Sequence, residues 1–341
     1  MSGPRTPVAI IGGGLAGAAL AWRLGRLGCP VTLFTGGALT GRDATEASGG
    51  LLRGYETDPE AARQAQLGLA ELRASPELRD WAGYRELRSA YLLRPGTDPG
   101  ELPPGARAVE AAELPVFRRL PPGTVAVLEP AAGCLSPARL RAALLAAVWE
   151  DGGTLRHEAV QQLSPDGELT SGSGGRERFR TVVLAAGPWT PGLLRRWGLP
   201  DQGLRVKQIQ YTLGRAALPG LPAFVDETTG LYGRPDGPGR ALLGLPTDSW
   251  PADPGALRPL PAPELARRAA QRLGLADWPG PAARTVTAAD CWAPADRPGG
   301  LRLRPLPPGG FATFTGGTGG AAKTVLAASR TAAAELLEGI S

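Results

Sequence analysis

Three glycines near the start of the sequence have the type and spacing that a phosphate-binding turn requires. Gly12, Gly14 and Gly17 follow an apolar run at 7–11 and precede a segment of helical character at 18–24. In such a strand–turn–helix the first glycine permits the tight turn and the second lets a pyrophosphate approach the backbone. The third lets the helix pack closely on the strand. The spacing is therefore typical of a dinucleotide-binding turn.

The helix expected after this turn would contribute to phosphate binding in a second way. Its first N–H groups, which include those of Leu15 and Ala16, have no partner within the helix, and its N-terminus carries the positive end of the helix dipole. An apolar segment at 31–34 completes a strand–helix–strand unit. We predict that a dinucleotide binds here; a purely structural glycine turn is the alternative.

The end of the second predicted strand lacks the acidic residue that usually binds the ribose hydroxyls of a dinucleotide. The sequence at this place reads Phe34-Thr35-Gly36-Gly37. The Thr35 hydroxyl can donate a hydrogen bond to a ribose, although a neutral hydroxyl binds less strongly than a carboxylate. Thr35 and Gly36 are therefore the expected ribose-side contacts.

The scarcity of histidine and cysteine argues against several kinds of functional site. His157 is the single histidine, and the three cysteines (Cys29, Cys134 and Cys291) lie far apart in the 341 residues. Zinc sites need clustered Cys and His, and a redox dithiol needs a CxxC spacing. We therefore expect no metal site and no disulfide framework. A histidine-dependent triad would have to use His157, which has no motif beside it.

The charge balance says little about partners. The net charge is +5 and the pI is about 9.5, and Lys207 and Lys323 are the only lysines among 37 basic residues. Coding bias toward arginine explains this composition, whereas a nucleic-acid surface would favour a run of basic residues that the sequence lacks. We expect no nucleic-acid partner, no signal peptide, no membrane span and a cytoplasmic location. The oligomeric state is not indicated.

Apolar periodicity and capping residues predict the remaining elements. Ser136 can cap a helix that Pro137 begins, so we expect a helix over 136–149. Other helices are expected at 59–80, 263–273 and 322–338, a short helical patch at 109–114, and strands at 89–94, 181–186 and 311–314.

The order of these elements predicts an α/β fold. Segments with strand–helix–strand character lie at both ends and in the middle of the chain, and less regular segments lie between them. We predict a discontinuous Rossmann-like dinucleotide-binding domain with an inserted α+β substrate domain built on an antiparallel sheet. The first domain is predicted to comprise 1–83, 134–200 and 286–341, and the second 84–133 and 201–285.

The stretch after the second strand resembles a known family. Segments 31–37 and 41–52 are similar to the flavin-binding stretch of the FAD-dependent glycine oxidase and D-amino-acid oxidase family. In that family the first unit binds the ADP half of FAD, and the following small residues wrap the pyrophosphate and the ring. The resemblance places Arg42, Ala47, Ser48 and Gly49 at such positions.

Four later segments extend the resemblance over nearly the whole chain. Segment 129–140 is similar to the stretch that opens the long middle helix, and Val160 matches a position whose backbone contacts adenine. Segment 182–190 resembles a flavin-proximal strand and turn. Segment 316–320 resembles the C-terminal turn beside the flavin. The cofactor contacts that these segments imply are Ala186, Gly187, Gly317, Thr318, Gly319 and Gly320, with Lys323 either near the flavin or on the helix surface.

The resemblance also suggests substrate residues. Segment 292–298 is similar to the family's Trp-Ala-Gly-x-Arg-Pro segment with one extra residue, which implies that Arg297 binds a carboxylate; a surface arginine is the alternative. Tyr232 matches a pocket tyrosine or is a core aromatic residue. The chain departs from the family at Thr35, at Thr318, where a histidine is common, and between 298 and 310, which is shortened.

The activity implied is the oxidation of an amine or amino acid, of glycine, D-amino acid or secondary amine type, by hydride transfer to FAD. The electron acceptor would be oxygen or another molecule. No general base is required if the amine binds without its extra proton. The alternatives are a degenerate FAD- or nucleotide-binding protein without turnover, and a flavoenzyme acting on a modified tRNA nucleoside.

Overall fold

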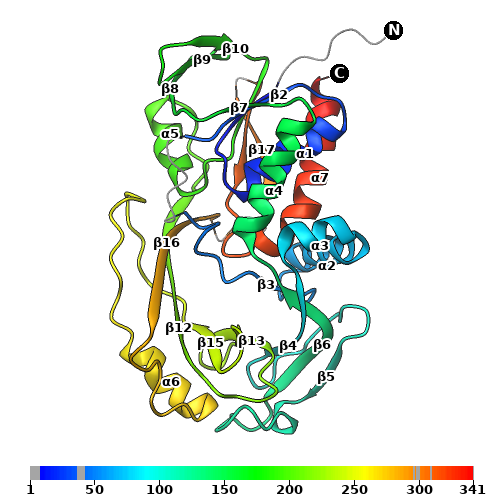
Figure 1. Ribbon diagram of the computed structural model, residues 1–341, viewed down its shortest axis with the longest axis vertical. Helices are drawn as coiled ribbons and strands as arrows, with labels where there is room; N and C mark the ends of the chain where they lie inside the picture. The colour runs from blue at the N-terminus through cyan, green and yellow to red at the C-terminus, as the bar shows by residue number, and fades with distance from the viewer. Residues whose placement is uncertain (1–7, 37–42, 295, 297–299, 308, 341) are drawn as a thin grey trace.

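The apolar run at the start of the chain forms a central strand of a six-stranded sheet, with the strand order β17-β18-β11-β1-β2-β7. A computed structural model describes residues 8–36, 43–294, 296, 300–307 and 309–340 (Figure 1). All pairings in this sheet are parallel except that between β17 and β18. The strands are β1 (Val8–Ile11), β2 (Val31–Phe34), β7 (Thr154–Arg156), β11 (Thr181–Leu184), β17 (Arg302–Leu306) and β18 (Phe311–Thr315).

The two faces of this sheet bury different neighbours. Val8 and Ile10 belong to the core shared with the helices, whereas Ala9 and Ile11 belong to a second core on the opposite face. This follows from the alternation of side chains along a strand. The helices on the first face are α1 (Leu15–Arg26), α4 (Pro137–Glu150) and α7 (Ala321–Ile340). The second face is covered by β8 (Val160–Leu163), β9 (Glu168–Ser171), β10 (Arg176–Arg178) and α5 (Thr190–Arg196), which follows η2 (Gly187–Trp189).

A second, nine-stranded sheet lies at the other end of the molecule (Figure 1). Its pairings are antiparallel except that between β13 and β4. Helix α6 (Pro263–Leu273) packs on it through Leu265 and Ala269. The strands are β3 (Leu51–Leu52), β4 (Arg85–Leu92), β5 (Arg107–Glu110), β6 (Val125–Cys134), β12 (Arg205–Arg215), β13 (Ala223–Asp226), β14 (Tyr232–Pro235), β15 (Arg240–Gly244) and β16 (Arg284–Trp292).

These two sheets confirm the predicted α/β fold class. The boundaries of the two predicted domains stay a prediction. Strand β16 crosses the boundary placed at residue 286, because it pairs with β12 from Arg284 to Trp292.

The predicted helices are present, but one of them is divided. The helix expected over 59–80 is two helices, α2 (Pro59–Ala74) and α3 (Pro76–Ala82). Ser75 is extended between them and caps α3, because the residue before a proline is disfavoured in helical conformation. Ser136 caps α4 as predicted, through its hydroxyl and the N–H of Arg139.

The structure differs from one smaller expectation. The patch expected at 109–114 contains only a three-residue 3₁₀ turn, η1 (Ala111–Glu113). Among the described residues, no helix is long and apolar enough to cross a bilayer, and no cluster of His, Cys, Asp and Glu has the composition of a metal site.

A buried ion pair fixes α6 to the second sheet. Asp226, at the end of β13, is fully buried, and the guanidinium of Arg272 donates to its Oδ2 at 2.7 Å. The same guanidinium donates to Thr228 Oγ1 at 2.8 Å and to the carbonyl of Arg118 at 2.6 Å. This network holds the turn that follows β13.

Replacing Arg272 with methionine should therefore lower the free energy of unfolding by about 3–5 kcal/mol, because it leaves the Asp226 carboxylate buried without its cation. Denaturant unfolding followed by circular dichroism measures this change. Arg267→Met is the matched control on the exposed side of the same helix and should change the free energy by less than about 1 kcal/mol. Equal losses in the two variants would contradict the assigned role of Arg272.

Candidate functional site

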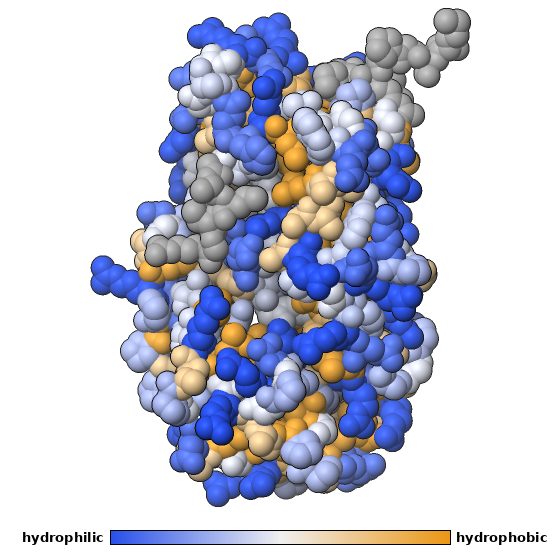
Figure 2. Space-filling model, viewed as in Figure 1, coloured by the Kyte–Doolittle hydropathy of each residue, from blue (hydrophilic) through white to orange (hydrophobic). Residues whose placement is uncertain are grey.

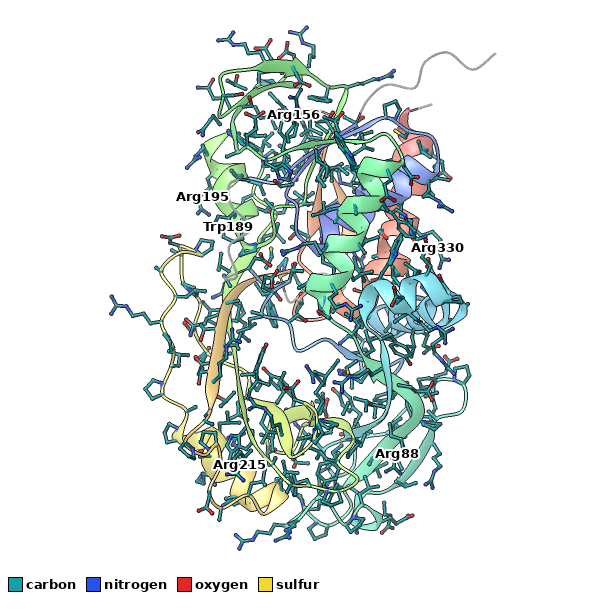
Figure 3. The ribbon with its side chains drawn as sticks, viewed as in Figure 1. Arg88, Arg156, Trp189, Arg195, Arg215 and Arg330 are labelled. Atoms are coloured by element: carbon teal, nitrogen blue, oxygen red, sulfur yellow. The ribbon has the colours of Figure 1, made fainter. Side chains whose placement is uncertain are left out.

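A cavity of about 980 Å³ lies between the two sheets and is lined by residues of both. Figure 2 shows a hollow between the upper and lower parts of the molecule. On the side of the parallel sheet its wall consists of the turn from β1 to α1, the loop 43–50, η2 and the turn before α7. On the other side it consists of β12, β14 and the turn after β13.

The three glycines of the first turn have different environments. Gly12 has φ +122°, and a Cβ added to it would lie 2.4 Å from the carbonyl oxygen of Ala185. A Cβ on Gly17 would lie 1.9 Å from the carbonyl oxygen of Gly12. Gly12 and Gly17 thus permit close backbone packing. A Cβ on Gly14 would find only Thr45 Oγ1 within 4 Å, at 3.6 Å, so this glycine leaves the cavity open.

The N-terminus of α1 faces the cavity at this point. Leu15 and Ala16 line the cavity, and the first turn of the helix contains no acidic residue. The N–H of Leu15 donates to Thr45 Oγ1 at 3.1 Å. An open space beside the positive end of a helix dipole suits phosphate groups.

The loop that carries Thr45 is held by a buried arginine. Arg141 of α4 is 7% exposed; its guanidinium contacts Asp43 Oδ2 at 3.1 Å and also pairs with Glu46. Asp43 Oδ1 in turn accepts the N–H groups of Thr45, at 2.8 Å, and of Glu46, at 3.0 Å. The position of this cavity-lining loop therefore depends on a charge supplied by α4.

The end of β2 forms another part of the cavity wall. Thr35 is buried, and its hydroxyl lies 3.3 Å from both the carbonyl oxygen of Arg156 and Nδ1 of His157. A Cβ on Gly36, which has φ +74°, would meet nothing within 4 Å. Val160 lines the same end of the cavity. His157 is exposed, in agreement with a structural or surface role.

The glycine-rich turn before α7 is fixed to the end of β16 by Asp290. The Asp290 carboxylate accepts the N–H of Cys291 at 2.8 Å and that of Gly319 at 3.0 Å. Thr318 has φ +51°; its N–H donates to the carbonyl of Cys291, and its hydroxyl oxygen accepts the N–H of Ala293, both at 3.2 Å. Burial raises the pKa of Asp290 to about 6, although the two N–H groups oppose this shift.

Three charged side chains meet where the loop after β3 approaches α7. Glu56 Oε1 lies 2.7 Å from Nη2 of Arg53 and 2.6 Å from Nζ of Lys323. Burial acts to raise the pKa of Glu56, but the two cations together hold it below its usual value. Burial lowers the pKa of Lys323. All three line the cavity, and the Lys323 side chain is only 12% exposed, so the surface interpretation of Lys323 is wrong.

Tyr232 lies on the opposite wall. Its ring crosses Gly244, where a Cβ would lie 2.3 Å from the ring, and its hydroxyl donates to the carbonyl of Gln210 at 3.1 Å. Burial raises its pKa, so the hydroxyl keeps its proton. Tyr232 lines the cavity and is half-buried rather than enclosed in the core.

Comparison with known proteins agrees with this geometry. The family model described as DAO, FAD dependent oxidoreductase, matches residues 7–335. The chain belongs to this DAO family. The family is FAD-dependent, and its match extends from β1 nearly to the end of α7. Comparison with curated protein sequences found no match.

Solved structures show the same DAO fold. L-proline dehydrogenase from P. horikoshii superposes with a TM-score of 0.82 at 15% identity, covering 99% of this chain and 95% of that one. Glycine oxidase from Geobacillus kaustophilus gives 0.78 at 22% identity, with 98% and 95% covered. NikD, an unusual amino acid oxidase essential for nikkomycin biosynthesis, gives 0.76 at 23% identity, with 97% and 93% covered.

Most of the residues expected to contact FAD in this DAO-family chain line the same cavity between the two sheets. Gly17 lies behind the wall, where it supports the turn. Arg42 and Arg297 lie outside the described residues. The residues on the wall are Gly12, Gly14, Leu15, Ala16, Thr35, Gly36, Ala47, Ser48, Gly49, Val160, Ala186, Gly187, Gly317, Thr318, Gly319, Gly320 and Lys323.

Sequence reasoning missed Arg53, Glu56 and Asp290. Arg53 and Glu56 follow the short apolar pair of β3, a place where charged residues are common on a surface. Their partner Lys323 is far away in the sequence, and no local pattern connects them. The only available signal was that Arg53 directly follows segment 41–52, which the family resemblance includes.

Substituting Gly14 by valine should abolish FAD retention while leaving the protein folded. The backbone of Gly14 is extended and the added side chain would occupy the open cavity, at a capping cost of about 1 kcal/mol. Absorbance of the purified protein at flavin wavelengths and its melting temperature measure the two effects. Gly17→Val, in contrast, should prevent folding because its Cβ meets the Gly12 carbonyl. Yellow Gly14→Val protein would exclude this position from the cofactor contact.

The raised pKa of Asp290 predicts a pH-dependent stability difference between the wild type and Asp290→Asn. Below about pH 4 the carboxyl is protonated in both folded and unfolded chains. Between about pH 4 and about pH 6 the unfolded chain has lost this proton, whereas the folded chain still holds it. Rising pH therefore lowers the free energy of unfolding of the wild type but not that of the variant. Denaturant titrations at several pH values should show that the free energy of unfolding of the variant, relative to the wild type, rises up to about pH 6 and stays constant at higher pH. A constant difference would contradict the raised pKa.

Proposed function

We propose that this protein oxidises an amine or amino acid by transferring a hydride from the carbon beside the nitrogen to FAD. The observation that carries the proposal is the pair of cations, Arg53 and Lys323, on the wall of a cavity that also contains the glycine turns. The names of the structural neighbours, which include a proline dehydrogenase and a glycine oxidase, support the same class of substrate.

The described residues fit FAD. Gly14, Gly36 and Gly187 lie on the cavity wall where an added Cβ would meet nothing closer than 3.6 Å, so a ligand can approach the backbone closely at these positions. In the proposed complex the turn at Gly14 and the α1 N-terminus hold the pyrophosphate, Thr35 and Val160 lie beside the adenosine, and the turn at 317–320 lies beside the ring. When bound, FAD supplies the hydride acceptor.

Arg53 and Lys323 are suited to bind a substrate carboxylate. One carboxylate, that of Glu56, lies between the two cations, so the cluster carries a net positive charge inside the cavity. A guanidinium offers a planar pair of donors, and an ammonium adds a third donor from another direction. Binding a carboxylate here would complete the neutralisation of the cluster and fix the substrate at one end.

Tyr232 is proposed to orient the reacting nitrogen. Because its hydroxyl proton is directed at the Gln210 carbonyl, the lone pairs of its oxygen are available to accept an N–H of the substrate. This interaction favours a neutral amine held with one N–H toward Tyr232, which leaves the nitrogen lone pair free to assist hydride departure. The electron acceptor, oxygen or another molecule, is left open.

Arg297 stays an alternative carboxylate ligand, as the family resemblance implies. The two assignments make different predictions for substitution, because Arg53 and Lys323 come from the β3 loop and α7, whereas Arg297 follows β16.

The test is anaerobic reduction of the FAD-loaded protein by a panel of amines and amino acids. Arg53→Met and Lys323→Met should each raise the KM or Kd of carboxylate substrates by about tenfold to a hundredfold, because each removes a charge-assisted hydrogen bond. Arg63→Met, which removes an exposed arginine of α2, is the control and should change nothing. If only Arg297→Met weakens binding, Arg297 is the anchor; if no amine bleaches the flavin, the proposed function is wrong.

A further inference from the structure

One carboxylate on the wall of the same cavity has no part in the proposed reaction. Glu227 lies in the turn after β13 and lines the cavity together with Val225 and Tyr232. Its backbone is fixed, because its N–H donates to the carbonyl of Leu92 at 2.9 Å and its neighbour Asp226 is held by Arg272. Glu227 is half-buried on this rigid turn, so its carboxylate is held in one place on the cavity wall.

Tyr91 connects Glu227 to the proposed carboxylate anchor. The hydroxyl of Tyr91 donates to Glu227 Oε1 at 2.8 Å, and the guanidinium carbon of Arg53 lies 5.0 Å from the centroid of the same ring. The ring is 7% exposed and packs edge-to-face on Tyr55, with 5.1 Å between centroids. A fixed aromatic ring therefore sets the separation between a cationic group and an anionic group on one cavity wall.

Nothing in the described part of the chain neutralises Glu227. No cationic side chain there comes within 4.0 Å of its carboxylate. Arg94 also lines the cavity, but its side chain is exposed and is not paired with Glu227. The hydrogen bond from Tyr91 satisfies one lone pair of one oxygen, which leaves the carboxylate able to accept further donors.

We propose that Glu227 binds a second, cationic group of the substrate. The proposal rests on the function proposed above: with the substrate carboxylate on Arg53 and Lys323, a chain extending through the cavity that all three residues line brings its far end to Glu227. The substrate class is then an amino acid, or its N-alkyl derivative, whose side chain ends in an amine or guanidinium. A charge-assisted hydrogen bond from that group to Glu227 selects it over neutral chains of equal length.

A purely structural role of Glu227, in which it only orients Tyr91, makes a different prediction. Glutamine at this position keeps an oxygen that accepts the Tyr91 hydroxyl but removes the charge. A structural role would therefore leave the choice between cationic and neutral substrates unchanged. A binding role would change it.

The experiment compares ornithine with norleucine and lysine with 2-aminoheptanoate, pairs whose side chains have equal numbers of non-hydrogen atoms, as both enantiomers, in the FAD-loaded protein. Calorimetry measures binding, and anaerobic flavin reduction measures the reaction. The wild type should prefer the cationic member of each pair at least about tenfold. Glu227→Gln should reduce this ratio by about tenfold to a hundredfold, with an unchanged melting temperature. Glu101→Gln, which removes an exposed carboxylate outside the cavity, should leave the ratio as in the wild type.

The outcomes separate the two proposals. If cationic and neutral substrates bind equally, or if Glu227→Gln leaves the ratio unchanged, the assignment of Glu227 is overturned even when the flavin is reduced. If the cationic members bind preferentially through Glu227 but no substrate reduces the flavin, Glu227 is supported as a binding residue and the proposed oxidation is wrong.

Discussion

The close approach of α1 to the parallel sheet is the constraint on which the rest of the structure depends. It exists because Gly12 and Gly17 have no side chains where the backbone passes the Ala185 carbonyl and the helix passes the turn. The approach brings the helix N-terminus to the carboxyl ends of β1 and β11, which is where open α/β sheets bind ligands. The loop held by Arg141 and the turn held by Asp290 then complete the wall of the cavity around that point.

Charge is arranged unevenly around the cavity. The glycine turns offer mainly backbone donors, whereas one part of the wall near the second sheet carries a series of charged side chains in the order Lys323, Glu56, Arg53 and, beyond Tyr91, Glu227. Burial makes each of these charges dependent on its neighbours. The proposed substrate preference follows from this order, because a ligand with complementary ends would satisfy the charges that the protein leaves incompletely paired.

Local patterns in the sequence predict local structure well in this chain. The glycine spacing, the capping Ser136 and the apolar runs identify β1, α1, α4 and β11, the last predicted at 181–186 and found at Thr181–Leu184. The family resemblance extends the assignment to the fold and FAD. The prediction of a single helix over 59–80 was wrong. Ser75 precedes Pro76 and therefore prefers an extended backbone, and this preference outweighed the helical pattern on both sides. The cluster of Arg53, Glu56 and Lys323 could not be predicted, since it depends on two segments that meet only after the second sheet and α7 have packed.

The pairing of β1 with β11 and the packing of α1 on α7 have a consequence for how the protein is made. The first strand–helix–strand unit is synthesised early, but its strand partner and its helix partner come from the middle and the end of the chain. Folds dominated by such distant pairings form slowly. During translation the face of α1 that packs on α7 would therefore stay uncovered until α7 has left the ribosome, so removing α7 should impair assembly of this earlier strand–helix–strand unit.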